Sequence, residues 1–173
     1  MFNRFQTLFI GTALLAATAP AFGIELQIGS AAPAVSALDQ NGQTVNLADA
    51  YKSGYTLVYF YPKADTPGCT KQACSLRDSF AKLTEHGVKV YGVSHDDVAA
   101  QKAFQDKYKL PFPLLADTKH EVSNAFGVPS KGDYAARQAF LIKDGKVIWL
   151  DREASTAEQA ADVLAALDGM KKQ

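Results

Sequence analysis

The fold of this chain is constrained most by one run, Tyr59–Cys74, which contains both of its cysteines. The apolar, aromatic segment Thr56–Tyr61 has the composition of a buried strand. Pro62 ends that strand, because proline has no N–H to donate to a sheet, and the loop that follows is rich in turn formers. A helical pattern then runs from Cys69 to Glu85. The sequence therefore predicts a buried strand, a tight loop and a helix that begins at Cys69.

The predicted position of Cys69 has a chemical consequence. The first N–H groups of a helix have no partner within the helix and carry about half a positive charge. That charge favours a thiolate over a neutral thiol. The Thr66 hydroxyl is suited to hydrogen-bond the sulfur or an oxygen of a substrate, and Pro62 and Pro67 stiffen the loop. The pattern therefore indicates a rigid, electropositive setting for a nucleophilic sulfur.

The same residues match a known motif. Pro62, Thr66 and Cys69, in the spacing Pro-x-x-x-Thr-x-x-Cys, resemble the active-site signature of the peroxiredoxins, which are cysteine-dependent peroxidases. The run Thr-Pro-Gly-Cys-Thr, with Cys74 five residues after the first cysteine, resembles the peroxiredoxin Q / bacterioferritin comigratory protein subfamily. Later segments resemble the family as well: 92–96, 110–117 and 126–128. The resemblance implies a thioredoxin-like fold and reduction of hydrogen peroxide and small organic hydroperoxides without haem, flavin or metal.

The resemblance also assigns a role to each cysteine. Cys69 is the predicted peroxidatic nucleophile, whose thiolate attacks a peroxide oxygen and becomes a sulfenic acid. Cys74 is the predicted resolving thiol, which condenses with that sulfenic acid to an intramolecular disulfide. The residues alone leave two alternatives open. One is a permanent structural disulfide, which is common in secreted proteins; the other is an inert Cys74, with an external thiol as the resolving group.

Helix geometry limits how the two sulfurs can join. Five residues along an α-helix give a rise of ~7.5 Å and a turn of about 500°, so the two Cα atoms lie ~8.6 Å apart. A disulfide needs Cα atoms closer than about 7 Å. The sequence therefore predicts a helix with two states, folded when Cys69 and Cys74 are reduced and locally unwound when they are joined.

Three other residues complete the predicted site. Arg137 precedes the apolar segment Ala139–Ile142, and in the family an arginine at the start of this strand approaches the catalytic sulfur. The plain alternative is a surface arginine at a strand end. Thr66 is predicted to hydrogen-bond the peroxide, or else to cap a local turn. Pro62 is predicted to position the loop and has no chemistry of its own.

Charge and composition exclude other classes of function. The chain has 18 Lys+Arg and 18 Asp+Glu, whereas a nucleic-acid-binding protein shows a basic excess. The three histidines are scattered and the cysteines lack zinc-ligand spacing, so no metal and no other cofactor is expected. His95 and Asp96 together suggest acid–base chemistry, but a solvated loop at a strand end is the simpler interpretation.

Residues 1–23 have the pattern of a secretory signal peptide. Arg4 gives a positive start, the apolar run after it is too short to span a bilayer comfortably, and small residues follow. Cleavage is predicted after Ala21 or Gly23, and a retained N-terminal anchor is the alternative. Residues 24–173 suit a single domain. The expected location is the bacterial periplasm, with no membrane association after cleavage.

The rest of the chain predicts alternating strands and helices. A hairpin over 35–47 turns at Asn41-Gly42, ahead of the strand and helix that carry the cysteines. The predicted elements after these are strand 88–94, helix 98–108, strand 112–116, helix 122–126, hairpin strands 139–142 and 146–150, and a closing helix 156–167 capped by Ser155 or Thr156. This order predicts an α/β, thioredoxin-like fold: a mixed central sheet with helices on both faces and an N-terminal β-hairpin extension.

The predicted peroxidase has two rivals and one expected partner. A thiol–disulfide oxidoreductase on the same fold would act on protein thiols, but such enzymes normally carry Cys-x-x-Cys, and this chain has Cys-x-x-x-x-Cys. A non-enzymatic secreted module with one structural disulfide is the second rival.

The resemblance implies a monomer whose disulfide is reduced by a thioredoxin-like protein. Because the periplasm is kept oxidising, that donor would depend on a membrane-fed reducing relay.

Overall fold

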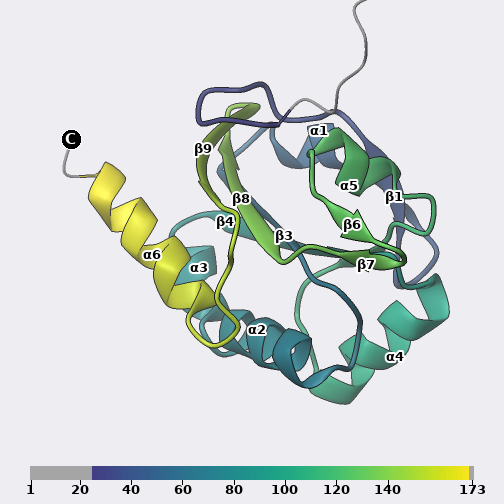
Figure 1. Ribbon diagram of the computed structural model, residues 1–173. Coiled ribbons are helices and arrows are strands. Elements are labelled where there is room, and N and C mark those ends of the chain that lie inside the picture. The colour runs from purple at the N-terminus through teal and green to yellow at the C-terminus, as the bar shows by residue number, and fades with distance from the viewer. Residues whose placement is uncertain (1–24, 172–173) are drawn as a thin grey trace, which may run out of the picture.

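A computed structural model describes residues 25–171, and the predicted signal peptide, residues 1–23, lies outside them. The described residues form a seven-stranded sheet in the order β2-β1-β5-β4-β3-β8-β9, and a separate hairpin of β6 and β7 (Figure 1). The strands are β1 (Ser36–Asp39), β2 (Thr44–Asn46), β3 (Tyr55–Phe60), β4 (Val88–Ser94), β5 (Leu114–Ala116), β6 (Ser130–Lys131), β7 (Tyr134–Ala135), β8 (Gln138–Lys143) and β9 (Lys146–Asp151).

The sheet is mixed, as the sequence predicts. β3, β4 and β5 run parallel, whereas β1, β2, β8 and β9 join through antiparallel pairs. The N-terminal hairpin of β1 and β2 turns where Asn-Gly predicts it. Gly42 has a φ of 73°, a left-handed conformation that glycine adopts without a steric penalty, and its N–H donates to the Asp39 carbonyl at 3.0 Å.

Helices cover both faces of the sheet, which confirms the predicted α/β architecture (Figure 1). One face carries α2 (Pro67–Asp78), α3 (Phe80–Glu85), α4 (Val98–Tyr108) and α6 (Gln159–Met170), and the other carries α1 (Leu47–Ala50) and α5 (Glu121–Ala125). Among residues 25–171, no helix combines the length and the apolar character that crossing a membrane requires.

β3 is the central strand of this core. Leu57 and Tyr59 point into the cluster under α2 and α6, and Val58 and Phe60 point into the cluster under α1 and α5. All four side chains are fully buried. A strand buried on both faces reads as a continuous apolar run, which is why its position could be predicted from the sequence.

The structure corrects the helix that was predicted to run from Cys69 to Glu85. Two helices, α2 and α3, stand in place of the predicted one. The first of them, α2, already begins at Pro67, because proline is tolerated in the first helical turn, where its missing N–H has no partner to lose. The helical pattern also breaks at Ser79, with φ −101° and ψ 8°, and restarts as α3. Serine is a weak helix former in such interior positions.

Two further differences lie in the second half of the chain. The closing helix begins at Gln159 with Glu158 as its N-cap, so the predicted start at residue 156 is wrong. Ser155 still accepts a hydrogen bond from the Glu158 N–H at 3.0 Å, but in the turn before the helix. The β6–β7 hairpin was not predicted, because strands of two residues are too short to show a periodic pattern.

The interpretation of His95 as part of a solvated loop is also wrong. Its side chain is buried, its Nε2 lies 3.0 Å from the Ser123 hydroxyl, and its ring stacks on His120 with centroids 3.7 Å apart. The Ser123 hydroxyl also donates to the buried Asp117 carboxylate at 2.8 Å. Burial, followed by the neighbouring His120, lowers the pKa of His95 below its ordinary value. His95 therefore acts as a neutral core residue between β4 and α5.

The register of the sheet decides which loops meet at its edge. Because β3 and β4 are parallel, the chain leaves both at the same edge. Gln138 at the start of β8 pairs with Phe60 at the end of β3. Arg137, one residue before β8, is therefore delivered to the edge where the loop after β3 leads into α2.

We expect Gly92→Ala to destabilise the fold by about 1–3 kcal/mol through overpacking. Gly92 pairs with Tyr59 across β3 and β4, and an added Cβ would lie 2.7 Å from the Tyr59 hydroxyl and 2.8 Å from the Leu114 side chain. Urea unfolding measures the change. Gly169→Ala is the control, because the space around Gly169 is open and alanine favours a helix by up to about 1 kcal/mol. Equal effects of the two substitutions would contradict this packing.

The buried state of His95 predicts a pH dependence of stability. Because burial lowers the pKa of His95 in the folded protein, the unfolded chain takes up a proton more readily once the pH falls below about 6.5. The free energy of unfolding should therefore fall as the pH drops from 7 to 5, and by less in His95→Gln. Urea unfolding at several pH values measures both slopes. Identical slopes for the two proteins would contradict the assignment.

Candidate active site

Cys69 lies in the first turn of α2, as its sequence position predicts. Thr66 is the N-cap and Pro67 is the first helical residue. Only 1% of the Cys69 surface is exposed. The Thr66 side chain makes no capping hydrogen bond, so the first N–H groups of α2 are not neutralised by it and their partial positive charge stays near the sulfur.

Arg137 supplies a full positive charge to the same sulfur. Its Nη2 donates to the Cys69 Sγ at 3.4 Å, and its Nη1 donates to the Gln72 Oε1. Its backbone carbonyl accepts a hydrogen bond from the Ala154 N–H at 3.2 Å, which fixes the chain just before β8. The structure thus brings two of the predicted site residues, Cys69 and Arg137, into direct contact.

Two glutamines behind Arg137 escaped the sequence analysis. Gln72 and Gln159 are both fully buried, and the Gln72 Nε2 donates to the Gln159 Oε1 at 2.8 Å. Gln72 carried a usable signal, because a residue three positions after Cys69 shares its helix face. Gln159 carried none, because its contact depends on how α6 packs against α2.

Gly68 leaves room for the guanidinium. A Cβ at this position would lie 3.2 Å from the Arg137 Nη2 and 3.5 Å from the Thr156 methyl group. A larger residue would therefore press on the nitrogen that contacts the sulfur. The glycine beside the reactive cysteine is explained by this close approach.

The loop that carries Pro62 and Thr66 is held from several sides. The Asp96 carboxylate accepts hydrogen bonds from the Ala64 N–H and the Ser94 hydroxyl, both at 2.7 Å. Asp96 thus fixes the loop through the Ala64 backbone. The Thr66 hydroxyl donates to the Lys63 carbonyl at 3.0 Å. This is the local turn contact that the sequence offers as the alternative to a bond with peroxide.

An ion pair anchors the tip of that loop to α4. Asp65 has a φ of 58°, and its carboxylate accepts from the Lys107 ammonium at 2.7 Å and from the Tyr108 hydroxyl at 2.6 Å. These hydrogen bonds hold the pKa of Asp65 below its ordinary value. The strained backbone at Asp65 is thus fixed by contacts to another element.

Tyr59 forms part of the buried surroundings of both cysteines. Its hydroxyl makes no hydrogen bond within the described residues. Burial, followed by the proximity of Tyr61, Cys69 and Cys74, raises the pKa of Tyr59 well above its ordinary value. Tyr59 is therefore a neutral phenol in the core and contributes packing to the site.

Cys74 lies on the same helix as Cys69, and both thiols are free. Cys69 is buried, whereas Cys74 is partly exposed. Because α2 is continuous from Pro67 to Asp78, helical geometry keeps the two Cα atoms too far apart for a disulfide. The structure thus has the folded helix that the sequence predicts for the reduced protein.

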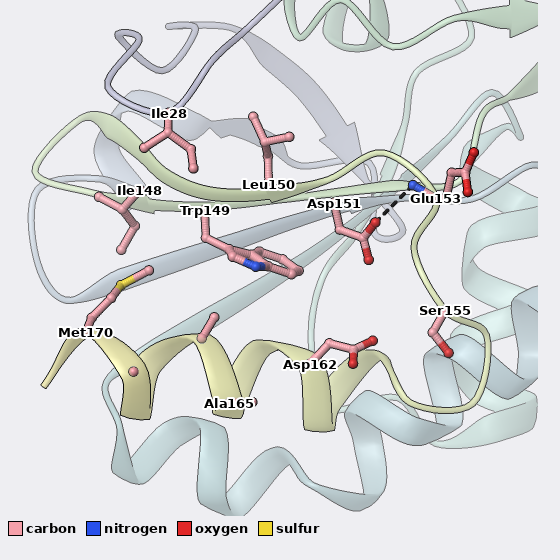
Figure 2. A pocket seen from close by; sticks show the side chains of 12 residues that line it. Ile28, Ile148, Trp149, Leu150, Asp151, Glu153, Ser155, Asp162, Ala165 and Met170 are labelled. Carbon is pink, nitrogen blue, oxygen red and sulfur yellow. Dashed lines mark hydrogen bonds between the residues drawn. The ribbon is translucent and has the colours of Figure 1, made fainter. Parts of the chain in front are cut away.

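A groove of about 1010 Å³ lies between β9 and α6 (Figure 2). Apolar side chains such as Ile148 and Met170 line one part of it, and Asp151 and Asp162 line another. Neither Cys69 nor Arg137 borders it.

Within residues 25–171, no cluster of His, Cys, Asp and Glu has the arrangement of a metal site.

Known proteins resemble this chain in sequence. Residues 28–150 match the AhpC/TSA family. Chloroplastic peroxiredoxin Q from Oryza sativa subsp. japonica is 45% identical over 122 residues, which cover 69% of this chain and 56% of that protein. The Arabidopsis thaliana peroxiredoxin Q is 45% identical over 124 residues, covering 70% of this chain and 57% of that protein. The chain thus spans little more than half the length of these curated relatives.

Solved structures resemble the fold along almost their whole length. The peroxidoxin BcpB from Mycobacterium tuberculosis has a TM-score of 0.78 and 32% identity, and the match covers 83% of this chain and 97% of that one. The bacterioferritin comigratory protein from Xanthomonas campestris has a TM-score of 0.75 and 28% identity, with 84% and 97% covered. With residues 28–150 matching its model, the chain belongs to the AhpC/TSA family, and its resemblance to the peroxiredoxin Q group is confirmed.

Proposed function

We propose that this protein is a thiol-dependent peroxidase that reduces hydrogen peroxide and small organic hydroperoxides. One observation carries the proposal: the buried Cys69 sulfur lies at the start of α2, with the Arg137 guanidinium 3.4 Å away. Two sources of positive charge thus act on one sulfur. The structure of the Xanthomonas campestris relative was described together with its alkyl peroxide reduction activity, which supports organic hydroperoxides as a substrate class.

The proposed reaction begins at the Cys69 thiolate. Its electron pair attacks one peroxide oxygen, the O–O bond breaks, and the leaving oxygen takes a proton to become water or an alcohol. The sulfur is thereby oxidised to a sulfenic acid. Arg137 stabilises both the initial thiolate and the negative charge that develops on the leaving oxygen. Arginine suits this role because its planar guanidinium presents several donors at once.

Thr66 and Pro62 act on the substrate side of this proposal. Thr66 is the N-cap of α2, three residues before Cys69. Its hydroxyl is proposed to hydrogen-bond a peroxide oxygen at the Cys69 sulfur. That role requires the hydroxyl to leave the Lys63 carbonyl or to accept a bond from the peroxide while it still donates to that carbonyl. Pro62 directs the chain from β3 into the loop.

Cys74 is proposed to resolve the sulfenic acid. Its thiolate would attack the Cys69 sulfur and release water, which forms an intramolecular disulfide. Since the helix keeps the two residues ~8.6 Å apart at Cα, the first turns of α2 must unwind before the sulfurs join. A thioredoxin-like protein would then reduce the disulfide by thiol–disulfide exchange.

Location and assembly stay predictions. The signal-like pattern of residues 1–23 supports a periplasmic protein, but these residues lie outside the described ones. The curated relatives named above are chloroplastic. The monomer expected from the resemblance is likewise a prediction, and size-exclusion chromatography with light scattering tests it.

The roles of the cysteines predict distinct products with stoichiometric hydrogen peroxide. The reduced protein should form an intramolecular disulfide, Cys74→Ser should stop at a sulfenic or over-oxidised Cys69, and Cys69→Ser should not react. Mass spectrometry of the intact proteins identifies each product. If the wild-type protein forms no intramolecular disulfide and stops at the same Cys69 product as Cys74→Ser, Cys74 is inert and an external thiol resolves instead. No peroxide-dependent product in any variant would favour a thiol–disulfide oxidoreductase or a structural disulfide.

Removing the guanidinium should slow the reaction. Arg137→Gln loses a charge-assisted hydrogen bond of about 1.5–3 kcal/mol, so the oxidation rate of Cys69 should fall by about 10- to 100-fold. Stopped-flow measurement with hydrogen peroxide reads the rate. Arg152→Gln is the matched control, because it removes the same charge from a side chain that binds Glu25 and the Leu26 carbonyl instead. A similar loss in both variants would contradict a specific role of Arg137.

A further inference from the structure

We propose that Gln159 is a positioning residue for the cysteine site, which acts through Gln72 and Arg137 on the Cys69 sulfur. Its catalytic meaning rests on the proposed peroxidase function. Gln159 is the first residue of α6 and has no exposed surface. Its link to the site is the hydrogen bond that its Oε1 accepts from the Gln72 Nε2 at 2.8 Å.

The amide group of a glutamine has two unlike ends: its oxygen only accepts hydrogen bonds and its NH₂ only donates them. The Gln72 Oε1 accepts from the Arg137 Nη1, so the Gln72 Nε2 needs an acceptor on the opposite side. The Gln159 Oε1 is that acceptor. If the Gln72 amide turned by half a rotation, its NH₂ would meet the guanidinium, donor against donor. Gln159 thus fixes the one orientation in which Gln72 can hold Arg137.

The Gln159 amide is itself oriented for this contact. Its Nε2 is buried and makes no hydrogen bond within the described residues, which costs free energy. Turning the amide would direct its NH₂ at the NH₂ of Gln72 and would break the bond between them. This orientation of the Gln159 amide preserves the chain of bonds that ends at Arg137.

The same contacts tie the start of α6 to the part of α2 that holds the cysteines. The Ala160 N–H donates to the Ser75 hydroxyl at 3.2 Å, and Gln159 accepts from Gln72. These two attachment points on α2 lie on either side of Cys74 in the sequence. Unwinding α2 to join the cysteines would carry Gln72 away from Gln159, so Arg137 would lose its anchor in the oxidised state.

The test uses the full chain with Cys74→Ser, in which Cys69 is the one remaining thiol. The rate of Cys69 alkylation by iodoacetamide is measured from acid to alkaline pH, because only the thiolate reacts. Gln159→Leu removes the acceptor at nearly constant volume. We expect the midpoint of its pH profile to rise by about half a pH unit or more, since a cation a few ångströms from a thiolate shifts such midpoints by roughly 1–3 units. An unchanged midpoint would overturn the proposal.

A second substitution separates positioning from general damage. In Gln72→Glu, either carboxylate oxygen can accept from Arg137, so the orientation no longer depends on residue 159 and adding Gln159→Leu should move the midpoint far less. Leu167→Ala is the matched control, because it opens a cavity in the buried face of α6 about two turns after Gln159. If Gln159→Leu shifts the midpoint equally with and without Gln72→Glu, or if Leu167→Ala gives the same shift, Gln159 has a merely structural role.

Two further measurements distinguish a folding defect from a lost positioning role, and the positioning role from the proposed peroxidase function. If Gln159→Leu does not fold, as judged by circular dichroism, Gln159→Met offers a flexible side chain of similar length for the same titration. The alkylation profile is recorded without peroxide. If the midpoint shifts as expected but the protein has no peroxidase activity, the proposed function is overturned and the positioning role stands. If the protein reduces peroxide normally but the midpoint does not shift, the positioning role is overturned and the proposed function stands.

Discussion

The contact between the Arg137 guanidinium and the Cys69 sulfur is the interaction on which the rest of the site depends. Cys69 has only 1% of its surface exposed, so little water is available to stabilise the anion of its sulfur. The N-terminus of α2 contributes only partial positive charges, so the full charge of Arg137, with its Nη2 3.4 Å from the sulfur, has the larger effect. The register of β8, the glycine at position 68 and the two glutamines each serve to keep that charge in place.

The proposed reaction requires a site that is rigid in its loop and reversible in its helix. Asp96 and Asp65 fix the loop before α2 by hydrogen bonds to the Ala64 backbone and to α4. The helix itself has to change if the cysteines are to join, because its geometry separates them. Loop contacts that do not involve α2 can persist while the helix unwinds. The proposed reaction therefore combines a fixed loop with a helix of two states.

The sequence was informative where the signal is local and failed where it depends on packing. The buried strand β3, the reactive cysteine at a helix start and the Asn-Gly hairpin each leave a periodic or turn pattern in the chain. Arg137 was found through the family resemblance, and its contact with Cys69 follows from the pairing of Gln138 with Phe60. Gln159 lies 87 positions from Gln72, and no spacing rule connects them. His95 was misjudged because burial by α5 has no local signature.

The most direct test of this account is the second-order rate constant for the oxidation of Cys69 by hydrogen peroxide, compared with that of free cysteine at the same pH. Fixed positive charge beside a buried sulfur predicts a rate constant at least about tenfold above free cysteine, since each tenfold corresponds to about 1.4 kcal/mol of transition-state stabilisation. A rate constant equal to or below that of free cysteine would contradict the account, because burial would then outweigh the charges gathered at the sulfur.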